Sequence, residues 1–345
     1  LKPVLLRREG NIIGSNVSEM LGTFLLILPT FALGDSAISV FGHKAPDTDT
    51  VTAALIYAWE LNERKIPATA YRLGELNPET AYVLKALDVE VPPLLAALEP
   101  KASVAIVDTN NPAELPDGIP KASIHSIVDH HKLSGLTNSE PLEIDMRPLC
   151  SATSILYSRA KASNLTIPRK IAGLMLAGIL SDSLVFRSPT TTGLDKTHAD
   201  ELFKLSGMEL TFGDAMLEAK AQVDHLSAEE LLMMDTKIFK IGGKQLRISV
   251  LETTQPTAPL AKKVELIEGQ RMLVKKEGLD DMLFFVVDIL QESATFIASS
   301  PSAKAIVERA WKTTVAQDDT VVLPGVLSRK KQIIPVLEEA AKDEL

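Results

Sequence analysis

The sequence predicts an α/β protein with two domains, and three observations support this fold class. Short apolar runs alternate with longer segments in which apolar residues recur every three or four positions, which is typical of a mostly parallel sheet with helices on both faces. The 345 residues exceed the usual length of a single domain. A break near residue 222 is followed by a capping-box pattern, which indicates that a second, smaller α/β unit begins there.

The larger domain is expected to alternate strands and helices. Strands are predicted at short apolar runs, and helices where apolar residues repeat along one helical face. Asn77, before Pro78, is the expected N-cap of one helix. The predicted strands span 38–41, 68–72, 104–107 and 124–128. The predicted helices span 51–62, 78–86, 151–163, 168–180, 194–205 and 210–222.

The smaller domain is expected to open with a helix at Ser227, because Glu230 follows three positions later. Gly242 and Gly243 indicate a hairpin turn. The predicted strands span 236–241, 245–250, 284–290 and 294–299, and the predicted helix spans 259–277. We therefore assign 38–222 to the larger domain, 223–227 to a hinge linker and 228–345 to the smaller domain.

Composition excludes several function classes. The 36 Lys and Arg residues against 45 Asp and Glu residues give a net charge of −9, so nucleic-acid binding, which needs a basic face, is not expected. Cys150 is the single cysteine, which excludes an intramolecular disulfide and a multi-cysteine zinc site. It also favours a reducing compartment, so we expect a cytoplasmic protein.

Residues 1–37 are expected to form an extension outside both domains. The apolar run at 20–33 is too short to span a membrane, so no stable membrane association is expected. Basic residues precede the run and a small-residue site follows it, so a signal peptide over residues 1–34, which would imply a periplasmic location, is the alternative.

Acidic and histidine residues follow apolar strands or a buried helix at four places in the larger domain. The segments are GHKAPDTD, VAIVDTN, SIVDHHK and GILSDS. Because the carboxyl ends of parallel strands share one edge of a sheet, we expect these side chains to meet there. Gathering so many carboxylates without a cation would cost several kcal/mol per buried charge, so bound metal is the economical explanation.

The ligand types indicate which metal is bound. Mixed imidazole and carboxylate ligands without thiolate favour Mn²⁺ or Co²⁺, with Zn²⁺ as an alternative. The candidates outnumber the roughly three protein ligands of a single catalytic ion, so two ions that share carboxylates are expected.

These motifs, in order along the chain, resemble those of the family II inorganic pyrophosphatases, manganese- or cobalt-dependent members of the DHH phosphoesterase superfamily. The resemblance rests on GHKAPDTD, the aspartate of VAIVD, SIVDHHK, GILSDSLVFRSPTTT and SRKKQIIP, and it extends from about residue 38 to about residue 337. It implies a DHH-type larger domain that holds the metals and a smaller DHHA2-type domain that clamps the substrate.

The resemblance implies a role for each matching residue. His131 would contact the substrate and donate a proton to the leaving phosphate, while Lys237, Arg329 and Lys330 would clamp the substrate. One ion would be held by His43, Asp47, Asp108 and Asp182. The other would be held by Asp49, Asp108, His130 and Asp182, so that Asp108 and Asp182 bridge the two ions.

The implied reaction is hydrolysis of pyrophosphate to two orthophosphates by a metal-generated hydroxide, with an additional Mg²⁺ arriving with the substrate. Closure of the smaller domain would complete the site. The resemblance also implies a homodimer. Thr109 departs from the family pattern, in which many members carry His after the aspartate.

Three other readings remain open. An exopolyphosphatase or tripolyphosphatase would share the same domain types. A superfamily phosphoesterase acting on short oligonucleotides or nucleotides typically carries a GGGH-type motif, whereas Gly242 and Gly243 are followed by Lys244. A binding protein without activity is disfavoured, because every expected ligand is present.

Overall fold

The structure is a computed structural model that describes residues 37–342. Apart from Ala37, the predicted extension and its signal-peptide alternative lie outside the described residues. Within residues 37–342, no helix is long and apolar enough to cross a membrane.

The sheet of the larger domain is parallel throughout, where the sequence predicts a mostly parallel sheet. Its strands are β1 (Ile38–Phe41), β2 (Ala68–Ala70), β3 (Ser103–Val107), β4 (Ser123–Asp129) and β5 (Glu143–Met146). They lie in the order β2, β1, β3, β4, β5, and every neighbouring pair is parallel. β5 is not predicted from the sequence; it is a short edge strand in which Ile144 remains 53% exposed. Chain segments that leave the carboxyl ends of β1, β3 and β4 therefore start from one edge of the sheet.

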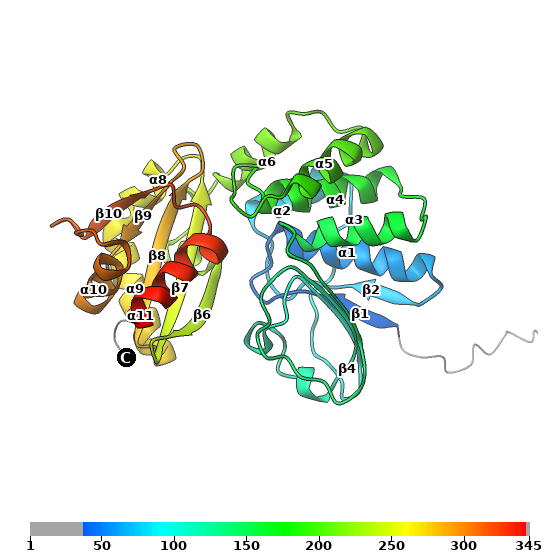
Figure 1. Ribbon diagram of the computed structural model, residues 1–345, viewed down its shortest axis with the longest axis horizontal. Coiled ribbons are helices and arrows are strands. Elements are labelled where there is room, and N and C mark those ends of the chain that lie inside the picture. The colour runs from blue at the N-terminus through cyan, green and yellow to red at the C-terminus, as the bar shows by residue number, and fades with distance from the viewer. Residues whose placement is uncertain (1–36, 343–345) are drawn as a thin grey trace, which may run out of the picture. The chain divides into compact units, whose positions relative to one another are not determined.

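Helices cover one face of this sheet, and α1, α3, α4 and α5 lie together on that side in Figure 1. They are α1 (Thr48–Glu63), α2 (Pro78–Ala86), α3 (Ala152–Ala162), α4 (Arg169–Asp182), α5 (Gly193–Ser206) and α6 (Phe212–Lys220). Val40, Val107 and Val128 of the sheet share a buried core with Tyr57 of α1 and Met175 of α4. All six predicted helices are present, with ends that differ by a few residues.

The other face of the sheet is covered by shorter elements. There Ile106 and Ile127 belong to a buried cluster with Leu115 and Ile119. These last two residues lie in or beside the 3-10 helices η1 (Pro112–Glu114) and η2 (Ile119–Lys121). η1 and η2 are not predicted from the sequence, because three-residue turns show no helical repeat.

The smaller domain is built on a second, mixed sheet. Its strands are β6 (Thr236–Ile241), β7 (Lys244–Thr253), β8 (Asp281–Asp288), β9 (Ser293–Ile297) and β10 (Thr320–Pro324). They lie in the order β10, β9, β8, β7, β6, with only the β7 and β8 pair parallel. The predicted hairpin is confirmed, and Gly242 and Gly243 both have positive φ, at 57° and 81°.

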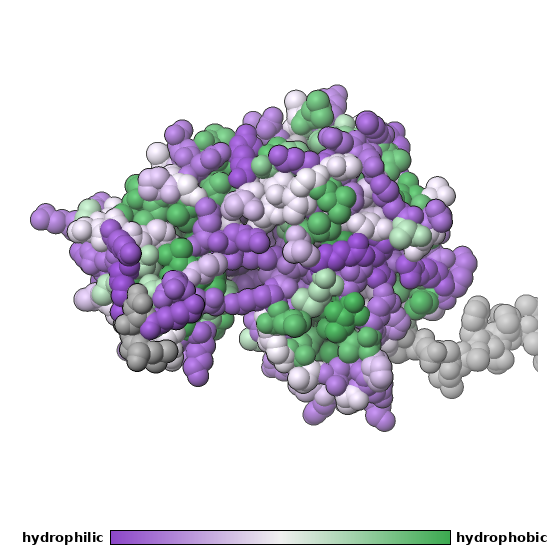
Figure 2. All heavy atoms as spheres, in the orientation of Figure 1, coloured by the Kyte–Doolittle hydropathy of each residue, from purple (hydrophilic) through white to green (hydrophobic). Residues whose placement is uncertain are grey.

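The helices of the smaller domain are α7 (Ala228–Met233), α8 (Thr257–Ala261), α9 (Lys263–Glu277), α10 (Pro301–Trp311), the π-helical segment η3 (Arg329–Ile333) and α11 (Ile334–Lys342). The predicted capping box between Ser227 and Glu230 is present. The single helix predicted at 259–277 is wrong in one respect, because the chain breaks at Lys262 into α8 and α9. In Figure 2 a band of hydrophilic side chains crosses the middle of the face shown, from α11 toward α1.

Candidate metal centre

The predicted metal ligands lie at the carboxyl edge of the parallel sheet. His43 follows β1, Asp108 follows β3 and His130 follows β4. The loop after β1 leads into α1, whose N-cap is Asp47 and whose first turn contains Asp49. The Asp47 carboxylate accepts a hydrogen bond from a backbone N–H of that first turn, so one side chain both caps the helix and faces the site.

Asp108 lies between two imidazole rings. Its Oδ2 is 3.4 Å from His43 Nε2, and its Oδ1 is 3.0 Å from His130 Nε2. The Thr50 hydroxyl donates a hydrogen bond to the same Oδ2. The backbone of Asp108 has a φ of 58°, a left-handed conformation that costs about 1 kcal/mol and is typical of functional sites. The strained backbone of Asp108 thus coincides with a buried carboxylate that faces both imidazole rings.

The candidate ligand atoms form three overlapping groups, in each of which the donor atoms lie within 4.8 Å of one another. Two of them are His43 with Asp47 and Asp108, and Asp49 with His130 and Asp182. The third, Asp108 with His130 and His131, shares Asp108 with the first of these groups and His130 with the second. Asp182 Oδ2 lies 3.5 Å from His130 Nε2. Within residues 37–342 no such group joins Asp182 to His43 or Asp47, so bridging by Asp182 stays a prediction.

Asp49 is held by the start of α3. Its two carboxylate oxygens accept hydrogen bonds from the backbone N–H groups of Ala152, at 2.7 Å, and Thr153, at 3.1 Å. An anion is stabilised there because the first N–H groups of a helix lack partners within the helix. Gly178 of α4 permits this packing, because a Cβ at that position would lie 2.7 Å from Asp49 Oδ1 and 2.4 Å from Thr153 Oγ1.

A backbone carbonyl orients the ring of His130. Its Nδ1 lies 3.2 Å from the Leu149 carbonyl oxygen, which can only accept, so Nδ1 carries the proton. The ammonium of Lys330, 3.3 Å from the same Nδ1, directs its hydrogen bond to the His130 carbonyl at 2.5 Å. His130 Nε2 is then left with a free lone pair, which is the arrangement of a metal-binding histidine.

Four buried polar atoms at this edge have no hydrogen-bond partner among residues 37–342. They are both ring nitrogens of His43, His130 Nε2 and Asp108 Oδ1. Buried polar atoms without partners are rare in folded proteins and call for an explanation. Because His43 Nε2, His130 Nε2 and Asp108 Oδ1 converge on the candidate ligand groups, divalent ions would satisfy these three atoms together. The imidazole and carboxylate donors fit Mn²⁺.

The pKa values of several groups in the cluster are raised, which indicates that the gathered carboxylates favour nearby positive charge. Burial and the neighbouring Asp108 raise the pKa of Asp49 to about 7. Burial and Asp49 raise the pKa of Asp182 well above its ordinary value. Although burial opposes the charged ring, the Asp47 carboxylate raises the pKa of His43 to about 10. Divalent ions would replace the protons that these groups otherwise hold.

Asp129 orients the predicted substrate residue His131, a role that the sequence analysis does not predict. Its Oδ1 accepts hydrogen bonds from His131 Nδ1 at 2.9 Å and from the backbone N–H groups of His130 and His131. His131 Nε2 is thereby left for the cavity that the ring lines. Burial, together with His130 and Lys237, lowers the pKa of His131 to about 4, so the ring of the free protein is neutral.

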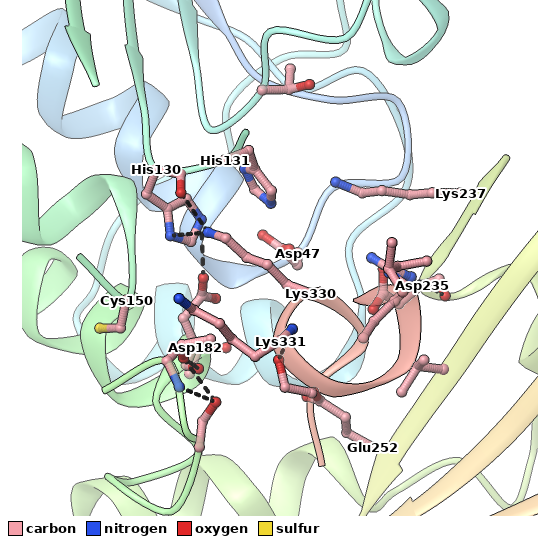
Figure 3. Close-up of a pocket in the computed structure, with 18 of the residues that line it drawn as sticks. Asp47, His130, His131, Cys150, Asp182, Asp235, Lys237, Glu252, Lys330 and Lys331 are labelled. Carbon is pink, nitrogen blue, oxygen red and sulfur yellow. Dashed lines mark hydrogen bonds and ion pairs between the residues drawn. The ribbon is translucent and has the colours of Figure 1, made fainter. Parts of the chain in front are cut away.

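Cationic side chains of the smaller domain reach the same cavity, which has a volume of about 640 Å³. Figure 3 shows Lys330 directed at His130 and Lys237 extending toward His131. Arg329 is held by Asp235, whose Oδ1 accepts a 2.7 Å hydrogen bond from the guanidinium. The structure thus brings all the predicted clamp residues to the rim or wall of one cavity.

Lys237 is paired with a carboxylate of the larger domain. Its Nζ lies 3.3 Å from Glu114 Oε2, and the same oxygen accepts a 2.7 Å hydrogen bond from the Thr109 hydroxyl. Although burial opposes it, Glu114 raises the pKa of Lys237, so the ammonium stays charged. Thr109, the residue that departs from the family pattern, therefore donates a hydrogen bond to Glu114, the carboxylate that pairs with Lys237. Glu114 is not among the residues predicted from the sequence, because nothing local distinguishes this acidic residue of η1.

Two known sequence families match the chain. The family described as "DHH family, N-terminal domain" matches residues 37–179, and the family described as "DHHA2 domain" matches residues 214–340. These matches lie in the order that the sequence resemblance implies.

Full-length relatives give the same result. A "probable manganese-dependent inorganic pyrophosphatase" of Bacillus licheniformis is 38% identical over 309 residues, covering 89% of this chain and 99% of the relative. A protein of the same name from Deinococcus radiodurans is 38% identical over 309 residues, covering 88% and 98%. A solved Methanococcus jannaschii structure, described as a candidate family II inorganic pyrophosphatase, has a TM-score of 0.80 and 32% identity, covering 88% of this chain and all of that one.

Proposed function

Because the chain belongs to the family II, manganese-dependent inorganic pyrophosphatases, we propose that it hydrolyses inorganic pyrophosphate to two orthophosphates. One observation carries this proposal beyond family membership. Asp108 presents one carboxylate oxygen to each of two buried imidazole nitrogens that lack hydrogen-bond partners among residues 37–342. That arrangement suits a carboxylate shared by two divalent ions.

The residues present fit a dinuclear Mn²⁺ site, with Co²⁺ as the alternative metal. His43, Asp47 and Asp108 would hold one ion. Asp49, Asp108, His130 and Asp182 would hold the other, and a second role of Asp182 on the first ion is kept as part of the proposal. When bound, such ions make water more acidic and neutralise phosphoryl oxygens, and an additional Mg²⁺ would accompany the substrate.

The cationic side chains of the smaller domain would bind the phosphoryl oxygens. Pyrophosphate hydrolysis passes through a loose transition state with charge spread over these oxygens, so positioned cations lower the barrier. The Arg329 guanidinium can hold two oxygens at once, while Lys237 and Lys330 act as point charges. Lys237 would exchange Glu114 for phosphate as the substrate enters.

His131 would complete the site from the larger domain. Its Nδ1–H is held by Asp129, so Nε2 is positioned to contact a phosphoryl oxygen. Proton donation from Nε2 to the leaving phosphate requires that the bound anion raise the low pKa of this ring. We keep this as the proposed role of His131, because an anion against Nε2 stabilises the charged form.

Closure of the smaller domain, 228–345, on the DHH domain, 38–222, is part of the proposal. Residues 223–227 would act as the hinge, since they join α6 of the larger domain to α7 of the smaller one, with Val223 and Leu226 packed against the core of the smaller domain. Closure would exclude water and bring Arg329 and Lys330 onto the substrate. Equal interdomain distances by spin-label measurements with and without a non-hydrolysable pyrophosphate analogue would contradict this motion. A homodimer and a cytoplasmic location likewise remain predictions.

The decisive assay compares substrates on the metal-stripped protein reloaded with Mn²⁺. The proposal expects orthophosphate release from pyrophosphate, with tripolyphosphate and longer chains hydrolysed far more slowly. The cavity of about 640 Å³ is larger than pyrophosphate requires, which favours tripolyphosphate or polyphosphate as the second candidate substrate. Faster release from those longer chains would replace the pyrophosphatase assignment with that alternative.

A further inference from the structure

A buried ion cluster lies outside the proposed ligand set and joins the two domains. The ammonium of Lys220, at the end of α6, lies 3.2 Å from Glu79 Oε2 of α2 and 2.9 Å from Glu252 Oε2 of β7. The side chains of Lys220, Glu79 and Glu252 are 12%, 1% and 28% exposed. Figure 3 shows Glu252 at the wall of the cavity. One ammonium thus neutralises carboxylates from both domains.

Glu79 connects this cluster to the metal centre. The same Oε2 that faces Lys220 accepts hydrogen bonds from the Thr48 hydroxyl, at 2.9 Å, and the Ser181 hydroxyl, at 2.7 Å. Thr48 stands between Asp47 and Asp49, and Ser181 immediately precedes Asp182. A single carboxylate oxygen is therefore fixed to two chain segments that carry three of the proposed ligands.

A purely structural role accounts for only part of this arrangement. Glu79 lies in the first turn of α2, where an acidic residue is favoured by the helix dipole. That effect requires neither burial nor a buried lysine from another helix. Burying three charged groups costs several kcal/mol unless each is paired, so a simpler apolar contact would hold α2 and α6 together at lower cost.

We propose that Lys220 is a positioning residue that couples the smaller domain to the metal ligands. Its ammonium holds Glu79 against Thr48 and Ser181, and it also binds Glu252 on β7 of the smaller domain. The inference rests on the metal centre of the proposed function. It requires bound divalent ions, but it does not depend on which phosphate ester or anhydride is hydrolysed.

The direction in which Lys220→Met changes Mn²⁺ affinity distinguishes a positioning role from a purely electrostatic one. Lys220→Met removes a positive charge near the metal centre, which by charge alone would strengthen Mn²⁺ binding or leave it unchanged. If Lys220 positions Glu79, the same change weakens binding, because Thr48 and Ser181 lose their fixed partner. Loss of an outer residue that orients metal ligands typically reduces metal affinity about 10- to 100-fold.

The test measures free Mn²⁺ by electron paramagnetic resonance during titration of the metal-stripped full chain, a readout independent of activity. We expect Lys220→Met to weaken Mn²⁺ binding by about 10-fold. The matched control is Lys170→Met. Lys170 lies on α4, the helix that ends at Asp182, and its exposed side chain is paired with Asp88. This variant should bind Mn²⁺ like the wild type. Unchanged or tighter binding by folded Lys220→Met would overturn the proposal.

Two further variants keep the test decisive if Lys220→Met fails to fold. Thr48→Val is nearly isosteric and uncharged, and it removes the hydroxyl that donates to Glu79, so Mn²⁺ binding should weaken several-fold. Glu252→Gln leaves Lys220 paired with Glu79, so it should keep Mn²⁺ affinity while raising KM for the substrate. Wild-type affinity in Thr48→Val, or an unchanged KM in Glu252→Gln, would refute the coupling. Absence of pyrophosphate hydrolysis by the wild type would instead refute the proposed function and leave the Mn²⁺ comparison valid.

Discussion

Gly178→Ala is expected to damage the metal centre by displacing one carboxylate. The new Cβ would lie 2.7 Å from Asp49 Oδ1 and 2.4 Å from Thr153 Oγ1. Carbon and oxygen atoms in contact normally stand about 3.3 Å apart, so Asp49 or α4 must move by roughly 0.6 Å. Functional groups must be held within about 0.5 Å of their working positions, so this shift exceeds the tolerance of a ligand.

The expected result is a loss of Mn²⁺ affinity of about 10-fold with a modest change in stability. Overpacking costs about 1 to 3 kcal/mol, and replacing a helical glycine by alanine returns about 1 kcal/mol. Isothermal titration calorimetry with Mn²⁺ measures the affinity of each variant for the ion. Thermal unfolding of the metal-stripped protein measures the change in stability separately.

Gly173→Ala supplies the matched control on the same helix. Its Cβ would meet the Cδ2 atom of Leu87 at 2.5 Å, the mobile end of a side chain that can rotate away from the metal centre. The helix gains the same propensity, and no proposed ligand is touched. If Gly178→Ala bound Mn²⁺ as tightly as Gly173→Ala, Asp49 would not be a ligand held by this packing.

Three other predictions follow from the contacts at the site. Asp108→Asn should fold but lose at least about 1,000-fold in kcat, because one change removes the charge between both ligand groups; phosphate release measures this, and near-normal kcat would discard the ligand assignment. Mn²⁺ binding at pH 7 should release protons, because raised pKa values leave His43 and Asp49 carrying protons that the ion displaces, and Mn²⁺ affinity should therefore fall as the pH falls. The binding heat measured by calorimetry in buffers of different ionisation enthalpy counts the released protons, and a heat that is independent of the buffer would contradict this prediction. Lys330→Met should raise KM for pyrophosphate by about 10-fold or more while Mn²⁺ affinity is kept, because its proposed phosphate contact is lost and no ligand is removed; steady-state kinetics test this, and an unchanged KM would exclude the clamp role.

The candidate metal centre could be predicted from sequence because its candidate ligands are tied to local patterns. Each follows a strand of the parallel sheet or ends a buried helix, and parallel topology brings such positions to one edge. Asp49 and His130 are examples, since both lie within motifs whose residues stand close together in the chain. Their grouping therefore follows from topology without knowledge of side-chain packing.

The residues around the ligands could not be predicted in the same way. Glu79 contacts Ser181 and Lys220 across 102 and about 140 positions, and only tertiary packing brings them together. Buried Asp129 stands in a predicted motif, but the sequence does not show that it orients His131.

Two helices of the smaller domain were missed for different reasons. The signal for α10 was available, because Ser300 before Pro301 is an N-cap followed by a favoured first residue. α11 continues directly from the π-helical η3, whose start is capped by the Ser328 side chain, so this cap lies six residues before α11 begins.

The most direct test of the proposed dinuclear centre is a titration of the metal-stripped chain with Mn²⁺ while pyrophosphate hydrolysis is followed. We predict that turnover is absent with chelator, rises with added Mn²⁺ and reaches its plateau when two ions are bound per chain. Full turnover in the presence of a strong chelator, or a plateau with no bound Mn²⁺, would contradict the account.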